Sequence, residues 1–256
     1  MKAVLLAAGY ATRLRPLTDD VPKHLLPVGG RPMLDWVLDR IGELGEVEEI
    51  HLVTNSRFAG VFAAWAEPHA VVVHDDGTKS NEDRLGAVGD LQLAVERGRL
   101  EDDELLVLAG DNLFDFSLAA YAAWWRAKPQ PASAVPLHDV GDLELATHYG
   151  IVETDVDGRV VSFVEKPSEP ASTLASTLIY LLPPAHVRLV ATYLEEGESP
   201  DNAGSFLGWL AGREPVYGYR FEGHWHDIGN RDQLLEADNR LRREAGLPER
   251  ATYSLD

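Results

Sequence analysis

The first two-thirds of the chain alternates short apolar runs with stretches whose apolar residues recur at helical spacing. In residues 32–44, apolar side chains return every three or four positions, which indicates a helix with one buried face. The same patterns predict strands at residues 3–6, 50–54, 70–74 and 105–109, and helices at 32–44, 57–66, 87–97 and 118–127. Alternation of this kind is typical of a mostly parallel sheet with helices on both faces.

From about residue 132 the pattern changes to strands with little helix between them. Strands are predicted at 132–138, 150–153, 160–165 and 174–182, and the turn Asp155-Val-Asp-Gly158 predicts a hairpin over 151–164. A strand pair in 216–228 and helices at 184–195, 205–211 and 232–243 complete the chain.

We therefore predict an α/β fold with three α/β/α layers, built on a mostly parallel, Rossmann-like mixed sheet with a sheet-rich extension. The chain is expected to form a single domain over 1–256. It divides into a first half (1–131), a second half (132–230), and a C-terminal helix and tail (231–256).

Composition and charge exclude several classes of protein. The 256 residues are 45% hydrophobic and 25% charged, as in ordinary soluble domains. There is no cysteine, which excludes a disulfide framework and thiolate chemistry. A net charge of −19 argues against nucleic-acid binding. No stretch is long and apolar enough for a membrane span and the N-terminus lacks a signal-peptide pattern, so a cytoplasmic protein is expected.

The N-terminal run Leu6-Ala-Ala-Gly-Tyr-Ala-Thr-Arg-Leu-Arg-Pro-Leu-Thr18 follows the first predicted strand, and Pro22-Lys-His-Leu-Leu-Pro-Val28 comes soon after it. Small residues let backbone N–H groups approach an anion closely, and the arginines and the lysine supply positive charge. Taken alone, Gly9 is equally consistent with a simple tight turn. The run is no P-loop, because Gly-Lys-Ser/Thr is missing. The combination predicts a nucleoside triphosphate site.

A second motif, Val107-Leu-Ala-Gly-Asp-Asn112, delivers an aspartate at the carboxyl end of a predicted strand. Magnesium prefers a few carboxylates together with phosphate and water. An Asp-Asn pair alone is also a common turn. Ligands of parallel sheets bind beyond the carboxyl ends of strands, which would bring Asp111 to the predicted phosphate site.

Three more motifs follow along the chain: Asp76-Gly-Thr-Lys-Ser-Asn-Glu-Asp-Arg-Leu-Gly-Ala87, then His148-Tyr-Gly-Ile-Val-Glu153 with Val164-Glu-Lys-Pro167, then Gly223-His-Trp-His-Asp-Ile-Gly229. With these five motifs in the family's order, from residue 3 to about residue 239, the chain resembles the sugar-1-phosphate nucleotidylyltransferases, or NDP-sugar pyrophosphorylases, and glucose-1-phosphate thymidylyltransferase-like enzymes in particular. The resemblance implies that Arg13, Lys23 and Asp111 are catalytic. The implied nucleotide-binding residues are Leu6, Ala7, Ala8, Gly9, Tyr10, Arg13, Lys23, Thr78, Asn81, Gly86 and Asp111. Among them, the family reads the base from the segment that holds Thr78, Asn81 and Gly86, and Asn81 is the best candidate for the polar base contact. The chain departs from the family pattern at Tyr10-Ala11, where two glycines are usual, and at His24, where several relatives carry Gln.

The resemblance also implies the other half of the site. Asp227, in Gly223-His-Trp-His-Asp-Ile-Gly229, would hold Mg²⁺ together with Asp111. His224 and His226 alone would also suggest zinc, but no third ligand is apparent. The implied sugar-phosphate residues are Asn112, Tyr149, Gly150, Glu165 and Lys166.

The implied reaction joins a nucleoside triphosphate, with dTTP or UTP favoured, to a sugar-1-phosphate and releases pyrophosphate. Two alternatives remain: a cytidylyltransferase acting on phosphocholine or another non-sugar phosphate, and a non-catalytic subunit that senses sugar nucleotides. The expected partners are the two substrates, with neither nucleic acid nor membrane. The resemblance makes a homo-oligomer possible, because the family often forms dimers or tetramers, and leaves the oligomeric state open.

Overall fold

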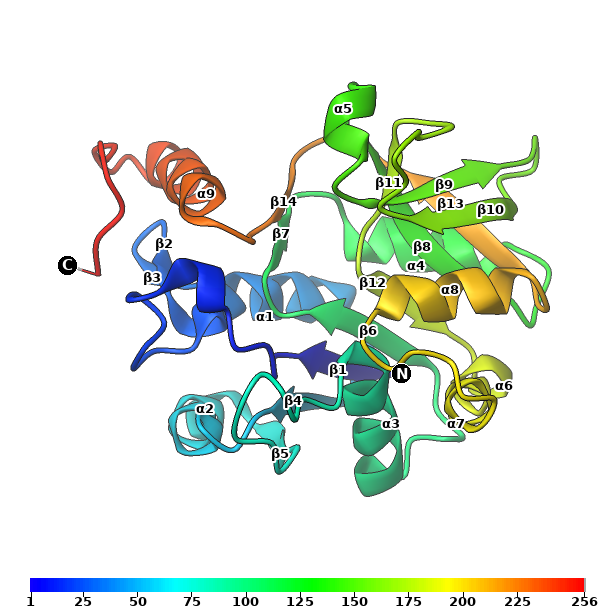
Figure 1. The fold of residues 1–256 in the computed structure, drawn as a ribbon, viewed down its shortest axis with the longest axis horizontal. Helices are drawn as coiled ribbons and strands as arrows, with labels where there is room; N and C mark the ends of the chain where they lie inside the picture. The colour runs from blue at the N-terminus through cyan, green and yellow to red at the C-terminus, as the bar shows by residue number, and fades with distance from the viewer. Residues whose placement is uncertain (256) are drawn as a thin grey trace.

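Ten strands form one mixed sheet in the computed structural model, which describes residues 1–255 (Figure 1). The strand order is β10-β9-β11-β8-β12-β6-β1-β4-β5, and β13 also pairs with β8. These strands are β1 (Lys2–Leu6), β4 (Glu49–Thr54), β5 (Val71–Asp75), β6 (Leu105–Ala109), β8 (Ser133–Asp139), β9 (Gly150–Thr154), β10 (Val160–Glu165), β11 (Leu174–Ser176), β12 (Ile179–Leu182) and β13 (Val216–Arg220).

The parallel part of the sheet places the ends of two site-bearing strands next to each other. Strands β5, β4, β1 and β6 run parallel, with Leu6 of β1 opposite Ala109 of β6. Side chains along β1 alternate between the two faces, so that Val4 joins one hydrophobic core and Leu5 the other. The loops that leave β1 and β6 therefore emerge side by side.

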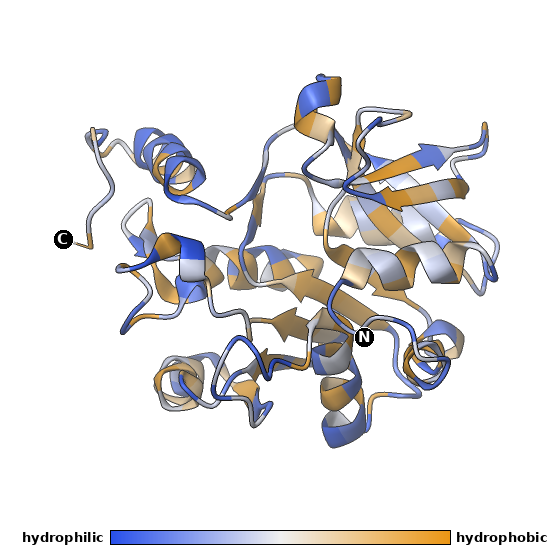
Figure 2. Cartoon of the chain, in the orientation of Figure 1, coloured by the Kyte–Doolittle hydropathy of each residue, from blue (hydrophilic) through white to orange (hydrophobic). Residues whose placement is uncertain are grey.

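Helices cover both faces of the sheet, as predicted from the alternating pattern. One core packs under α3 (Ala87–Gly98), α6 (Pro184–Val187), α7 (Leu189–Glu195) and α8 (Ala203–Ala211). The other packs under α1 (Met33–Leu44), α2 (Ala59–Ala66) and α4 (Leu118–Arg126). The three-layer α/β/α prediction is confirmed, and Figure 2 shows the apolar strands between more polar helices. Over residues 1–255, no helix has both the length and the apolar character needed to cross a bilayer.

The second half adds antiparallel strands, as the hairpin pattern predicts. Strands β9 and β10 form that hairpin. The strand predicted at 174–182 is two strands, because the chain changes partners at Thr177: β11 pairs with β8 and β9, and β12 with β6 and β8. The helix predicted at 184–195 is likewise divided into α6 and α7. Short additional elements are α5 (Leu143–Ala146) and the 3₁₀ turns Thr12–Leu14, Lys23–Leu25 and Glu67–His69.

Both strands predicted in 216–228 are present, but the prediction that they pair with each other is wrong, because each has another partner. Strand β13 runs parallel to β8, whereas β14 (Trp225–Asp227) pairs with β7 (Asn112–Phe114) in a separate two-stranded ribbon. This pairing joins the motif after β6 to the C-terminal motif.

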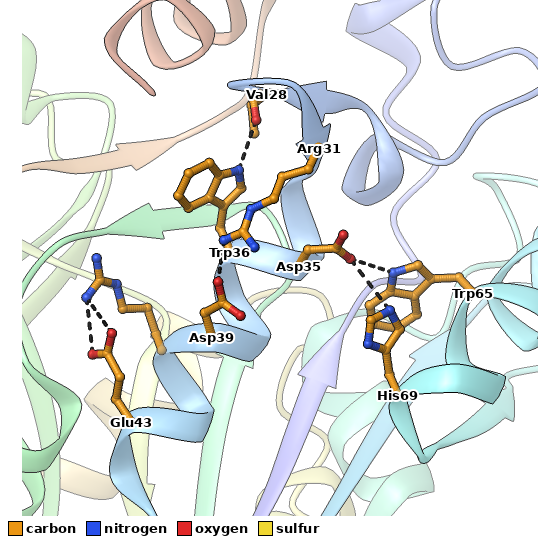
Figure 3. Close-up of polar contacts among 9 residues, drawn as sticks. Val28, Arg31, Asp35, Trp36, Asp39, Glu43, Trp65 and His69 are labelled. Atoms are coloured by element: carbon orange, nitrogen blue, oxygen red, sulfur yellow. Dashed lines mark hydrogen bonds and ion pairs between the residues drawn. The ribbon is translucent and has the colours of Figure 1, made fainter. Parts of the chain in front are cut away.

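Helix α1 anchors the small hairpin β2 (Pro27–Val28) and β3 (Arg31–Pro32), which follows the lysine segment (Figure 3). The indole N–H of Trp36 donates to the carbonyl of Val28 at 2.9 Å, and the Arg31 guanidinium lies 3.8 Å from the centre of that ring. Helix α9 (Arg231–Glu244) packs on the hairpin from outside, and the carboxylate of Asp238 accepts the N–H of Gly29 at 2.8 Å. These contacts hold the segment that carries Lys23.

Candidate active site

A cleft of about 1060 Å³ opens at the carboxyl ends of β1 and β6, between the parallel and antiparallel parts of the sheet. The predicted site residues that line it are Leu6, Ala8, Gly9, Tyr10, Arg13, Lys23, Asn81, Gly86, Asp111, Asn112, Tyr149, Gly150, Glu165, Lys166 and Asp227. Two predicted residues lie behind the wall instead. Ala7 is buried and its N–H donates to the Val53 carbonyl at 2.9 Å. Thr78 is buried, and its hydroxyl lies 3.0 Å from the Tyr10 hydroxyl.

The phosphate side of the cleft presents two cations from the loops after β1. Ala11 has the left-handed backbone conformation (φ 45°), which turns the chain into the 3₁₀ turn that carries the exposed Arg13. The Lys23 ammonium donates to the Asp111 carboxylate and, at 3.0 Å, to the Ile228 carbonyl. Burial alone would raise the pKa of Asp111, but the charges of Lys23 and His24 and the hydrogen bond from Lys23 together outweigh burial and keep that pKa below its ordinary value.

The ribbon of β7 and β14 brings the two predicted metal ligands together. Asp227 pairs with Asn112, and the Ile228 N–H donates to the Asp111 carbonyl at 3.4 Å. Burial, followed by the negative charge of Asp111, raises the pKa of Asp227 to about 6, although Lys23, Lys166 and Arg13 oppose the rise. Two partly buried carboxylates whose charges repel form a site that a cation would stabilise.

These donors fit a magnesium ion better than zinc. The carboxylates supply the hard oxygen ligands that Mg²⁺ prefers, and phosphate and water can complete its coordination. Across residues 1–255, no group of three or more His, Cys, Asp or Glu side chains could hold a metal. The His224 ring Nδ1 instead lies 2.9 Å from the Asp115 carboxylate. The zinc alternative therefore lacks a convergent ligand set in the described part of the chain.

The side of the cleft predicted to hold the sugar phosphate is built around Glu165, which packs between two glycines. A Cβ on Gly150 would come 2.9 Å from Glu165 Oε2, and one on Gly204 of α8 would come 3.0 Å from it. The next residue, Lys166, has a positive φ of 45°, and its N–H donates to the Tyr149 carbonyl at 3.0 Å. The Lys166 ammonium lies 3.4 Å from Glu165 Oε1 and its side chain is 60% exposed. A charged pair is thus presented to the cleft.

The predicted base-reading segment forms the remaining wall. Asn81 lies exposed in a loop, and its backbone carbonyl accepts a hydrogen bond from the Arg84 guanidinium at 2.7 Å. Gly86 has a φ of +83°, and a Cβ there would come 2.5 Å from the Pro200 carbonyl oxygen. The glycine is therefore required by the close approach of a distant segment as well as by its own backbone conformation.

Trp225, Asn202 and Asp90 are among the residues of the cleft wall that sequence reasoning missed. Trp225 donates its indole N–H to the Asn112 side chain, and its place inside the C-terminal motif was the available signal. Asn202 caps α8, and its side-chain oxygen accepts the Gly204 N–H at 2.7 Å. No motif or pattern near Asn202 in the sequence indicated that it lines the cleft. Asp90 also lines the cleft, and the signal there was an acid on the buried face of a predicted helix.

A family model described as nucleotidyl transferase matches residues 2–244, which is nearly the whole chain. The chain belongs to the nucleotidyl transferase family. Two nucleotidyl transferases with which it aligns are named UTP–glucose-1-phosphate uridylyltransferase. The one from Synechocystis sp. is 32% identical over 244 residues, covering 90% of this chain and 60% of the relative. The Haloferax volcanii protein, AglF, is 31% identical over 246 residues, covering 95% of this chain and 98% of the relative.

Solved structures of nucleotidyl transferases share the fold. The apo structure of a UDP-glucose pyrophosphorylase superposes with a TM-score of 0.77 at 21% identity, covering 96% of this chain and 99% of the other. The resemblance to sugar-1-phosphate nucleotidylyltransferases predicted from the motifs is thereby confirmed. The chain spans about 60% of the Synechocystis relative's length, and nearly all of the Haloferax relative's.

Proposed function

We propose that this nucleotidyl transferase catalyses the Mg²⁺-dependent transfer of a nucleotidyl group from a nucleoside triphosphate to a sugar-1-phosphate, releasing pyrophosphate and an NDP-sugar. One observation carries the proposal: a single cleft is lined by a cation pair, a carboxylate pair and a separate Glu-Lys pair. A triphosphate and a second phosphate ester need that distribution of charge. The triphosphate is assigned to the side formed by residues 1–131 and the sugar phosphate to the side formed by 132–230.

In this reaction an oxygen of the sugar phosphate attacks the α-phosphorus in line, and the bond to the bridging oxygen of pyrophosphate breaks. The attacking phosphate is already an anion, so no side chain has to remove a proton. Arg13 and Lys23 neutralise charge on the departing pyrophosphate, and Lys166 orients the attacking phosphate. Mg²⁺ held by Asp111 and Asp227 would supply charge neutralisation at the reacting phosphate.

The donor base proposed on the resemblance is uracil or thymine. The uridylyltransferase names of the Synechocystis and Haloferax relatives support uracil. Asn81 fits either base, because a side-chain amide both accepts from the ring N–H and donates to a ring carbonyl.

A substrate panel tests the proposal. Each of the four NTPs and dTTP is paired with several sugar-1-phosphates and with phosphocholine, and pyrophosphate release is measured with and without Mg²⁺. We expect release with a sugar-1-phosphate and UTP or dTTP, only when Mg²⁺ is present. Release with phosphocholine and CTP alone would favour the cytidylyltransferase alternative. Binding of an NDP-sugar without any pyrophosphate release would favour the sensing subunit. The presence of all the charged residues, Arg13, Lys23, Asp111, Lys166 and Asp227, argues against that alternative.

A further inference from the structure

One carboxylate in the cleft wall has no role in the chemistry proposed above. Asp90 lies one helical turn after Gly86, in the first turns of α3, and is 6% exposed. Its side chain lines the cleft together with Gly86, and with Leu6 and Ala109 at the ends of β1 and β6. It shares its helix face with Ala94, one turn further on, which packs into the core.

Within residues 1–255, the Asp90 carboxyl group has no hydrogen-bond or ion-pair partner. Its Oδ1 atom is buried and accepts no hydrogen bond. Burial, together with the negative charge of Asp76, raises its pKa to about 7. An unpaired buried carboxyl group destabilises the fold, and an alanine or leucine would suit this helix face better. A group of this kind at the wall of a cleft is a candidate for ligand contact.

The position of Asp90 along the cleft points to one part of the substrate. The base is assigned to the segment with Asn81 and Gly86, and the phosphates to Arg13 and Lys23. Asp90 lines the same cleft as both groups: its N–H donates to the Gly86 carbonyl at 2.8 Å, and its helix α3 packs against β1, the strand that leads into the phosphate loop. In a nucleotide the ribose joins base and phosphates, so the ribose is the unit expected beside Asp90.

A carboxylate oxygen accepts hydrogen bonds, and the ribose hydroxyls are donors. The uracil or thymine ring is a poor partner, because its one N–H is flanked by two carbonyl oxygens that a carboxylate repels. Of the two ribose hydroxyls, the 2′-hydroxyl is on the carbon next to the base. It is therefore the nearer of the two to a group one turn from Gly86.

We propose that Asp90 accepts a hydrogen bond from the ribose 2′-hydroxyl and makes the enzyme select ribonucleoside over 2′-deoxyribonucleoside triphosphates. The inference rests on the proposed function, in that a nucleotide must occupy this cleft. It narrows the donor from UTP or dTTP to the ribonucleotide, UTP.

Calorimetric titration tests the proposal without turnover. UTP and dUTP are titrated with Mg²⁺ into the wild-type protein and into Asp90→Asn and Asp90→Ala. One hydrogen bond to a charged acceptor is worth roughly 10- to 100-fold in affinity, so the wild type should prefer UTP over dUTP by about that ratio. The ratio should fall to within about threefold in Asp90→Ala, and Asp90→Asn, which keeps a neutral acceptor, should lie between.

Glu96→Gln is the matched control, because Glu96 is an exposed acid on the same helix whose carboxylate is engaged by Gln92 at 2.7 Å. That variant should keep the wild-type ratio. Equal binding of UTP and dUTP by the wild type, or a ratio that survives in Asp90→Ala, overturns the inference.

Two outcomes separate the inference from the proposed function. Selective binding of the ribonucleotide with no pyrophosphate release against any acceptor would defeat the proposed function and leave the role of Asp90 supported. Pyrophosphate release at equal rates from UTP and dUTP would support the function and defeat the inference.

Discussion

The two charged walls of the cleft differ in how firmly the structure holds their lysines. Lys23 is 14% exposed and bonds to groups from two other segments, the Asp111 carboxylate and the Ile228 carbonyl. Lys166 is 60% exposed, and its ammonium pairs with its neighbour Glu165 at 3.4 Å. The proposed phosphate wall thus holds its lysine in place through contacts with other segments, whereas the proposed sugar-phosphate wall presents a largely exposed lysine.

The two lysines should therefore contribute to different kinetic constants. A preorganised charge loses little free energy on reorganisation when the transition state forms, so its removal should lower the rate strongly. A mobile side chain loses rotamer entropy on binding, so its removal should act mostly on substrate affinity. The variants below test that division of roles, from the largest expected effect to the smallest.

The largest effect is expected at the carboxylate pair of the preorganised wall. Asp111→Asn and Asp227→Asn should each lower the rate of pyrophosphate release by roughly 10³-fold or more, because Mg²⁺ loses one of its two protein ligands. Asp232→Asn, an exposed acid of α9 outside the cleft lining, serves as the control. Each variant is checked for an unchanged Tm. A variant of Asp227 that stays within tenfold of the wild-type rate would remove it from the metal site.

The two walls should separate in steady-state kinetics. Arg13→Ala should raise KM for the nucleotide and lower kcat, whereas Lys166→Ala should raise KM for the sugar phosphate with a smaller change in kcat. Each should cost on the order of 10²-fold in kcat/KM. Lys79→Ala, which removes an exposed lysine outside the cleft lining, should leave both constants unchanged. If Lys166→Ala acted mainly on KM for the nucleotide, the assignment of the two walls would be reversed.

A smaller effect is expected where Glu165 packs against glycine. A Cβ on Gly150 would come 2.6 Å from Phe163 Cζ and 2.9 Å from Glu165 Oε2, so Gly150→Ala must displace both side chains. We expect roughly a tenfold rise in KM for the sugar phosphate. Gly60→Ala, in α2 where a Cβ has nothing within 4 Å, is the matched control. Equal kinetics for the two variants would mean that Glu165 does not contact the sugar.

The comparison of the walls also explains what could be predicted from the sequence. Lys23 and Asp111 lie in loops that follow strands of a parallel sheet, so strand pattern and motif together predicted that they meet. The pairing of β14 with β7 was not predicted, because strands of three residues carry too little alternation to reveal a partner more than a hundred residues away. The requirement for glycine at 86 likewise depends on Pro200, a contact that no local pattern records.

Asp90 shows a different limit of sequence reasoning. Periodicity assigned the helix over 87–97 correctly, yet an acid on its buried face was passed over, since the pattern is read from the apolar residues. The buried, unpaired carboxyl of Asp90 lowers the free energy of unfolding, and the size of this loss can be measured from its dependence on pH.

Folding stability, unlike the rates above, should depend on pH through Asp90. The Asp90 carboxyl should ionise near pH 4 when unfolded and, with burial and Asp76 raising its pKa, near pH 7 when folded. Between these values the folded state keeps a proton that the unfolded state has lost, so stability falls as pH rises from 4 to 7 and stays low above 7. Asp90→Asn removes this loss. Between pH 4 and pH 8, the Tm of this variant without nucleotide should gain on that of the wild type by roughly 10 °C, which corresponds to about 4 kcal/mol. Glu96→Gln should show no such gain, and a pH-independent gap for Asp90→Asn would mean that Asp90 is already ionised in the folded protein at low pH.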